Sequence, residues 1–141
     1  MARAQTAFMA RTAVPARDAL QKALDALKLR LVLDDGYVPL DSSGYLPRTL
    51  DGEDAGFTIR FRPVQEELSA QPALAAALAA AGEVVAVEFK WSGDVREEVS
   101  AMGVCAALAG SFGAVVLDPA TGAPLDAARL LARAKAGLDE L

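Results

Sequence analysis

Histidine and asparagine are absent from this chain of 141 residues, and Cys105 is its only cysteine. One chain therefore cannot form a disulfide, a zinc or copper site built from Cys and His, or a Ser-His or Cys-His nucleophile pair. Cys105 lies in an apolar stretch, where we expect a buried and unreactive thiol. A reducing compartment suits such a chain, so we expect a cytoplasmic protein.

Positive charge is also in deficit, because 14 Lys and Arg stand against 19 Asp and Glu, a net charge of −5 at pH 7. Nucleic acids and anionic membranes bind proteins through an excess of positive charge, so we expect neither as a partner. Residues 99–117 contain no charge, but their three Gly and two Ser make them weakly hydrophobic, and they divide into a helix and a strand. We therefore predict no membrane span.

Hydrophobic periodicity divides the chain into helices and strands. Pro15 opens a segment with apolar residues at helical spacing through Leu27. An Asp94-Glu97 capping box and an N-cap at Asp126 predict the starts of two further helices. Alternating or continuous apolar residues predict five strands, over residues 29–33, 45–50, 57–61, 83–91 and 113–117.

These elements predict a single α+β domain over residues 15–141. We expect a two-layer sandwich, with helices packed mainly on one face of a mixed β-sheet of about four or five strands. Strand 83–91 is the expected central strand. The helix after this strand is expected to end at Gly110 and to form a crossover connection, so that strand 113–117 runs parallel to strand 83–91. Residues 1–14 are expected to be a frayed N-terminal extension or a short helix.

Acidic side chains gather in the segment LDGEDAG, where Asp51, Glu53 and Asp54 are close in sequence. Asp51-Gly52 is typical of a tight hairpin turn. The spacing does not match the ligand positions of an EF-hand loop. The residue types leave three interpretations open: a solvated turn, contact with a basic partner, or a carboxylate site for a metal or for catalysis.

Trp91 is the only tryptophan, and it lies where a strand meets the glycine turn that leads to Asp94. It is interpreted either as a residue that caps the core or as an anchor for a partner. The glycines form no phosphate-binding motif, and Ser111 does not lie in a nucleophile elbow. We predict no catalytic residue, cofactor or metal, and assign these residues to partner binding: Asp51, Glu53, Asp54, Trp91 and Asp94.

Two segments are similar to a known group of proteins: GYLPRTLDGEDAGF at residues 44–57 and VEFKWSGDVREEVSAMGVCAALAGSFGAVVLDPATG at residues 87–122. The chain resembles small bacterial proteins found among the immunity proteins of polymorphic interbacterial toxins. The similarity lies in the Gly-Tyr-Leu-Pro turn, the Asp-Gly-Glu loop, the Trp-Ser-Gly-Asp corner and the Val-Leu-Asp-Pro exit. It implies an antitoxin without enzymatic activity that binds a cognate toxin tightly, often by covering its active site.

Our hypothesis is that the toxin is bound through an acidic surface that includes Asp51, Glu53 and Asp54. We therefore expect a salt-sensitive complex with the toxin, and a monomer or homodimer when the protein is free. If the toxin is a nuclease, its basic groove suits the net negative charge of this chain. The alternative is an adaptor or scaffold subunit that assembles with itself or associates with a secretion apparatus. That alternative predicts a stable homo-oligomer formed through an exposed apolar patch.

Overall fold

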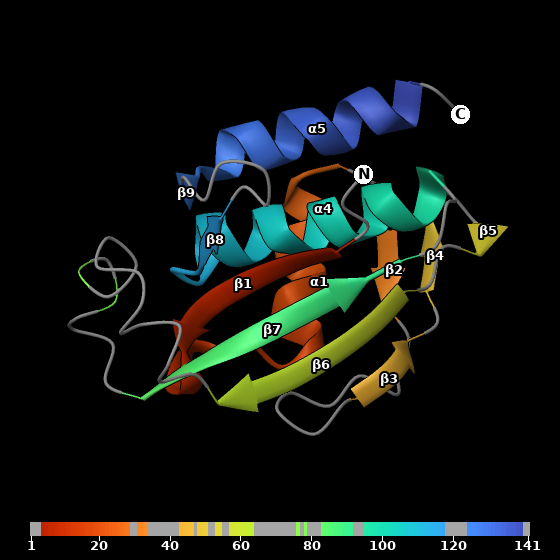
Figure 1. Ribbon diagram of the computed structural model, residues 1–141. Coiled ribbons are helices and arrows are strands. Elements are labelled where there is room, and N and C mark those ends of the chain that lie inside the picture. Colours follow the sequence, from red (N-terminus) through yellow and green to blue (C-terminus); the bar gives the residue numbers. More distant parts are fainter. Residues whose placement is uncertain are drawn as a thin grey trace.

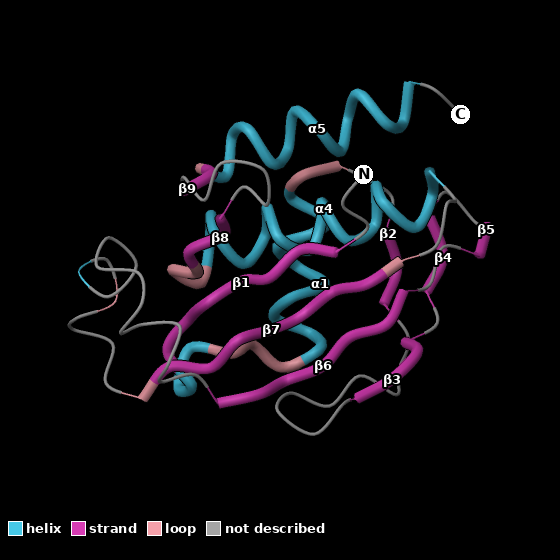
Figure 2. The backbone as a smooth tube through the Cα atoms, viewed as in Figure 1, coloured by secondary structure: helices cyan, strands magenta, loops and turns pink. Residues whose placement is uncertain are grey.

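The computed structural model describes residues 4–28, 31–33, 43–46, 48–50, 53–54, 57–63, 76, 78, 83–91, 95–117 and 124–139. Its elements, in chain order, are β1 (Ala4–Ala10), the 3₁₀ turn η1 (Arg11–Ala13), α1 (Arg17–Ala26), β2 (Leu31–Leu33), β3 (Ser43–Leu46), β4 (Arg48–Leu50), β5 (Glu53–Asp54), β6 (Phe57–Pro63), β7 (Val84–Lys90), α4 (Val95–Ser111), β8 (Val115–Leu117), β9 (Pro124–Leu125) and α5 (Ala127–Asp139). Figure 1 shows their arrangement, and Figure 2 shows the same view as a tube.

The main sheet has six described strands in the order β3-β6-β7-β1-β8-β9. The α+β class with helices packed on a sheet is confirmed. The expected mixture of parallel and antiparallel pairs is not found, because every described pair in this sheet is antiparallel. Strands β7 and β8 do run in the same direction, as expected, but β1 lies between them and pairs antiparallel with both.

The expected N-terminal extension is wrong for residues 4–10, which form the central strand β1. All seven residues of β1 pair with β7, from Ala4 opposite Lys90 to Ala10 opposite Val84. The side-chain amide of Gln5, which is buried, donates a hydrogen bond to the carbonyl of Leu117 and ties β1 to the end of β8. The N-terminal segment is therefore part of the core of the domain.

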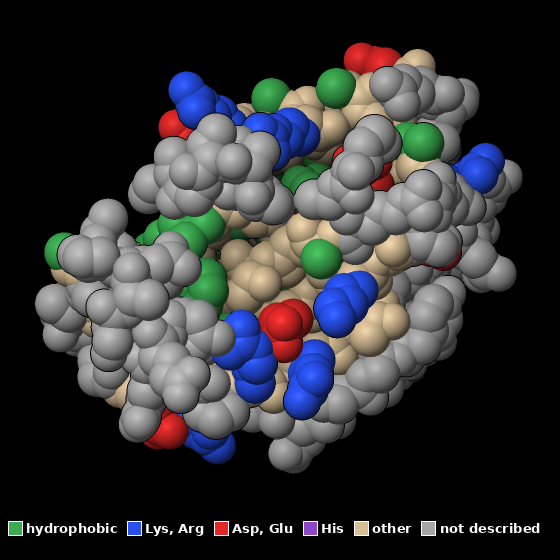
Figure 3. All heavy atoms as spheres, in the orientation of Figure 1, with side chains coloured by type: hydrophobic (Ala, Val, Ile, Leu, Met, Phe, Trp, Pro, Cys, Tyr) green, Lys and Arg blue, Asp and Glu red, His purple; other side chains and the backbone are tan. Residues whose placement is uncertain are grey.

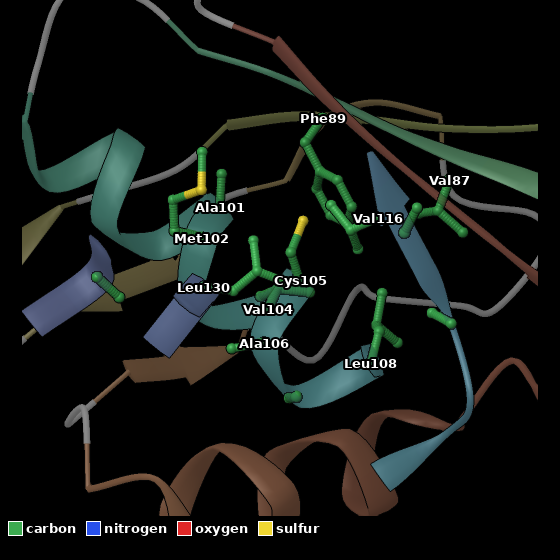
Figure 4. Packing of buried hydrophobic residues seen from close by; sticks show 14 of the residues in the cluster. Val87, Phe89, Ala101, Met102, Val104, Cys105, Ala106, Leu108, Val116 and Leu130 are labelled. Atoms are coloured by element: carbon green, nitrogen blue, oxygen red, sulfur yellow. The ribbon is translucent and has the colours of Figure 1, made fainter. Parts of the chain in front are cut away.

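Helix α4 lies between the sheet and α5. Its residues from Val99 to Leu108 are all buried, which is typical of a helix that is covered on every side. It contacts α1 and strands β1, β6 and β8, and it packs along α5. In Figure 1, β1, β7 and β6 cross in front of α1, while α5 lies outermost beyond α4. The same core includes Phe89 of β7 and Val116 of β8, which Figure 4 shows close to Cys105 of α4.

The helices α4 and α5 approach closely at small residues. A Cβ atom placed on Gly137 of α5 would fall within 3.0 Å of the Val99 Cγ2 atom of α4. At the other end of the pair, a Cβ on Gly110 of α4 would lie 3.3 Å from the Cβ of Ala127. The two helices therefore run antiparallel, with a glycine at each end of their contact.

The start of α5 confirms the predicted N-cap, whereas α4 ends one residue later than predicted. The Asp126 carboxylate accepts a hydrogen bond of 2.8 Å from the Arg129 backbone N–H, so Asp126 is the N-cap of α5. Helix α4 continues past the expected stop at Gly110 to Ser111, and the chain then turns at Gly113, whose φ is +72°. Because a left-handed conformation strains residues with a Cβ, Gly113 ends the helix more readily than Gly110 does.

A second sheet has the order β2-β4-β5. Leu50 pairs with Glu53, and Thr49 pairs with Asp54, so β4 and β5 are adjacent antiparallel strands. The turn predicted at Asp51-Gly52 lies outside the described residues. The strand expected over residues 45–50 is divided, since Tyr45 and Leu46 belong to β3 and pair with β6 in the main sheet, whereas β4 pairs with β2. Strands β4 and β5 therefore belong to the second sheet, although they lie between β3 and β6 in sequence.

Candidate functional site

The two faces of the main sheet have different surroundings. Side chains alternate along a strand, so Val85, Val87 and Phe89 of β7 point to one face, where they join the core beneath α1 and α4. Val84, Ala86, Glu88 and Lys90 point to the opposite face, which we call the outer face. The outer face has an apolar half and a charged half.

The apolar half of the outer face is a small cluster around β1 and β7. Phe8, Leu78, Val84 and Ala86 are buried together there, and the partly buried Val115 and Leu117 of β8 pack against them. Leu78 comes from the segment between β6 and β7, so part of the chain covers this half of the sheet.

The charged half of the outer face, called the charged face below, comprises residues of β1, β6 and β7: Thr6, Thr58, Arg60, Arg62, Glu88 and Lys90. Thr58, Arg60 and Lys90 are exposed, and the other three are partly exposed. Pairing places Arg60 opposite Glu88, and Thr58 opposite Lys90. Figure 3 shows positive side chains around one acidic side chain over β6 and β7.

One ion pair organises the middle of the charged face. The Nε atom of Arg62 donates to the Oε1 atom of Glu88 at 2.8 Å, across the diagonal between the two strands. The side chains are 28% and 22% exposed, so water screens the pair only in part. Glu88 is therefore occupied by Arg62, although Arg60 is its direct neighbour across the strands.

The other two positive charges are not compensated. Within the part of the chain that the structure describes, neither Arg60 nor Lys90 forms a salt bridge or a side-chain hydrogen bond. Among the described residues of the charged face, three positive charges and one negative charge sum to +2, on a chain whose net charge is −5. The face is therefore a local region of positive charge that can attract carboxylates or other anions.

The described residues among those predicted for partner binding belong to, or directly follow, strands of the two different sheets. Glu53 and Asp54 form β5 of the second sheet, and Trp91 follows the last residue of β7 in the main sheet. Trp91 is partly buried and packs against the main core, which supports its interpretation as a core cap. Asp51 and Asp94 lie outside the described residues, and so do the side chains of Glu53 and Asp54.

Sequence reasoning missed Arg60, Arg62, Glu88 and Lys90 as a group. Alternation alone places Arg60 and Arg62 on a solvated face of one strand, and Glu88 and Lys90 on one face of another. The register of β6 against β7 brings the two pairs together, and no local signal in the sequence states that register. The pattern to search for is a pair of charged residues at alternate positions in each of two strands that pair antiparallel. In this chain, three of the four positions are basic and the fourth is Glu88.

The single thiol has no place in this site. Cys105 is fully buried in α4, and burial raises its pKa above the ordinary value because the thiolate would be desolvated. The expectation of a buried thiol is confirmed. Among the described residues, no group of three or more His, Cys, Asp or Glu is placed to hold a metal ion, and no helix is long and apolar enough to cross a membrane.

Comparison with known proteins yields no assignment. No family model matches the chain, and no curated protein or solved structure is similar enough to count as a match. The charged face therefore has to be interpreted from its own chemistry.

Proposed function

We propose that this protein is a binding protein without enzymatic activity, of the immunity-protein type, which neutralises a cognate bacterial toxin by forming a complex with it. The observation that carries the proposal is the charged face. It presents exposed charges from two strands that are fixed by a buried core beneath them. Such a surface recognises another macromolecule by charge and shape, with little rearrangement on binding.

The support lies in where the sheet places its charges. A strand with Val87 and Phe89 buried on one side holds Glu88 and Lys90 at fixed positions on the other. The loss of backbone entropy on binding is then small, which favours tight complexes. The predicted contribution of Asp51, Glu53 and Asp54 remains part of the proposal, as a second contact region on the β4-β5 hairpin.

Co-expression with the product of the neighbouring gene tests the proposal. We expect the protein to rescue cells from that product and the two to elute together from gel filtration, with a complex that weakens as the salt concentration rises. Growth arrest that persists despite co-expression, together with separate elution of the two proteins, would overturn the proposed function. A stable homo-oligomer that does not bind the product of the neighbouring gene would favour the adaptor or scaffold alternative.

A further inference from the structure

We propose that the charged face is a docking site for a short acidic segment of a partner protein, with Arg60 and Lys90 each receiving one carboxylate. This inference rests on the proposed function in that it names the chemistry of the partner's surface. The sequence predicts that an acidic surface of this chain contacts a basic partner. At the charged face the signs are opposite, since cations of this chain contact an acidic segment of the partner.

The spacing of the two free cations suits a pair of carboxylates. Arg60 is opposite Glu88, and Lys90 lies two residues further along β7, so Arg60 and Lys90 are diagonal neighbours about 7–8 Å apart at the level of the strands. Alternate residues of an extended segment place their side chains on one side about 6.7 Å apart. An acidic strand with carboxylates at alternate positions therefore reaches both cations at once.

The ion pair beside them limits what can bind. Glu88 keeps a negative charge in the middle of the face, and Arg62 holds it in place at 2.8 Å. Anions are attracted at the positions of Arg60 and Lys90 and are repelled beside Glu88, which lies directly opposite Arg60, so each carboxylate of the partner is expected to lie near one of the two cations and away from Glu88.

The size of the face also argues against a nucleic acid. Residues 58–62 extend about 13 Å along β6, and the three strands β6, β7 and β1 are about 10 Å wide. Nucleic-acid binding usually relies on several phosphate contacts, about 6–10 in a typical complex, whereas this face offers two free cations on a chain of net charge −5.

The dimensions predict a limited role within a larger interface. A standard protein interface buries about 800 Å² on each partner, several times the area of this face. The acidic segment is therefore one anchored part of the contact, and its charges affect the rate of association and its dependence on salt.

Hexaglutamate with blocked ends is a suitable probe, used with the full chain in two-dimensional NMR at low ionic strength. We expect the amide signals of residues 58–62 and 88–90 to shift and saturate with peptide. We expect Arg60→Gln with Lys90→Gln to raise the apparent Kd at least about 3-fold, since each exposed pair contributes modestly. The matched control is Arg129→Gln with Lys135→Gln on α5, which removes the same charge from exposed positions away from the sheet and should leave the Kd unchanged.

Three results would overturn the inference: shifts that gather on α5, equal binding by the two double variants, or a single-stranded oligonucleotide that shifts the same amides at lower concentration than hexaglutamate. The last result would assign the face to nucleic acid. Because the probe does not depend on the neighbouring gene, failure here is distinguishable from failure of rescue in the co-expression test.

Discussion

Gly137 of α5 is a position at which one added methyl group would disturb the packing against α4. A Cβ at residue 137 would lie within 3.0 Å of Val99 Cγ2, whereas carbon atoms in contact normally lie about 3.5–4.0 Å apart. Val99 is 1% exposed, and a β-branched side chain in a helix strongly prefers one rotamer, so it cannot turn away cheaply. Either the rotamer changes or α5 moves away from α4.

The expected cost follows from two opposing effects in Gly137→Ala. Overpacking a filled core costs about 1–3 kcal/mol, while replacing Gly by Ala inside a helix gains up to about 1 kcal/mol. Gly110→Ala is the matched control, because Gly110 also lies near the end of its helix and its added Cβ has 3.3 Å to Ala127. The difference between the two variants removes most of the propensity gain and leaves the amount by which the clash at Gly137 exceeds the milder crowding at Gly110.

Urea unfolding of the two variants measures this difference. We expect Gly137→Ala to have a free energy of unfolding about 1–3 kcal/mol below that of Gly110→Ala, with unchanged m-values. In a Val99→Ala background, which removes the obstructing methyl group, Gly137→Ala should become neutral or stabilising. Equal stability of Gly137→Ala and Gly110→Ala in the native background would refute the close approach of the two helices.

Three further predictions concern single residues. Lys28 follows Leu27, the C-cap residue of α1, and has a φ of 59°, so Lys28→Gly should raise the free energy of unfolding by about 0.5–1 kcal/mol in urea titration; a loss of stability would contradict the left-handed assignment. Asp126→Ala removes the N-cap of α5 and should cost about 1 kcal/mol, whereas Asp126→Asn should cost only a few tenths, so equal losses would argue against capping. Burial raises the pKa of Cys105, so the thiol ionises at lower pH in the unfolded chain than in the folded chain. The free energy of unfolding should therefore fall as the pH rises above about 8.5, where an unfolded thiol ionises, and Cys105→Ala should lack that part of the pH dependence.

Local patterns in the sequence predict the helices and the strands with strong alternation. The spacing of Leu20 and Leu24 predicts α1, and the Asp126 cap predicts the start of α5, because both signals lie within one or two turns of helix. Alternation in β6 and β7 likewise predicts which side chains face the core.

Long-range pairing decides the features that local patterns miss. The segment AQTAFMA contains three Ala and one polar Gln, so its composition does not indicate a central strand, and only pairing with β7 and β8 makes it one. The charged face depends on pairing in the same way, since Arg62 and Glu88 are 26 residues apart in sequence. The acidic hairpin residues, in contrast, attract attention because they are adjacent in sequence.

Calorimetry at two salt concentrations measures the affinity for the product of the neighbouring gene and shows whether the charged face binds an acidic segment of it. We predict that Arg60→Glu with Lys90→Glu weakens the complex by about 10-fold or more, because like charges then face the acidic segment of the partner. The control Arg129→Glu with Lys135→Glu changes the net charge equally on α5 and should stay within about 2-fold of the native affinity. Equal weakening by both pairs, or tighter binding by Arg60→Glu with Lys90→Glu, would contradict the account.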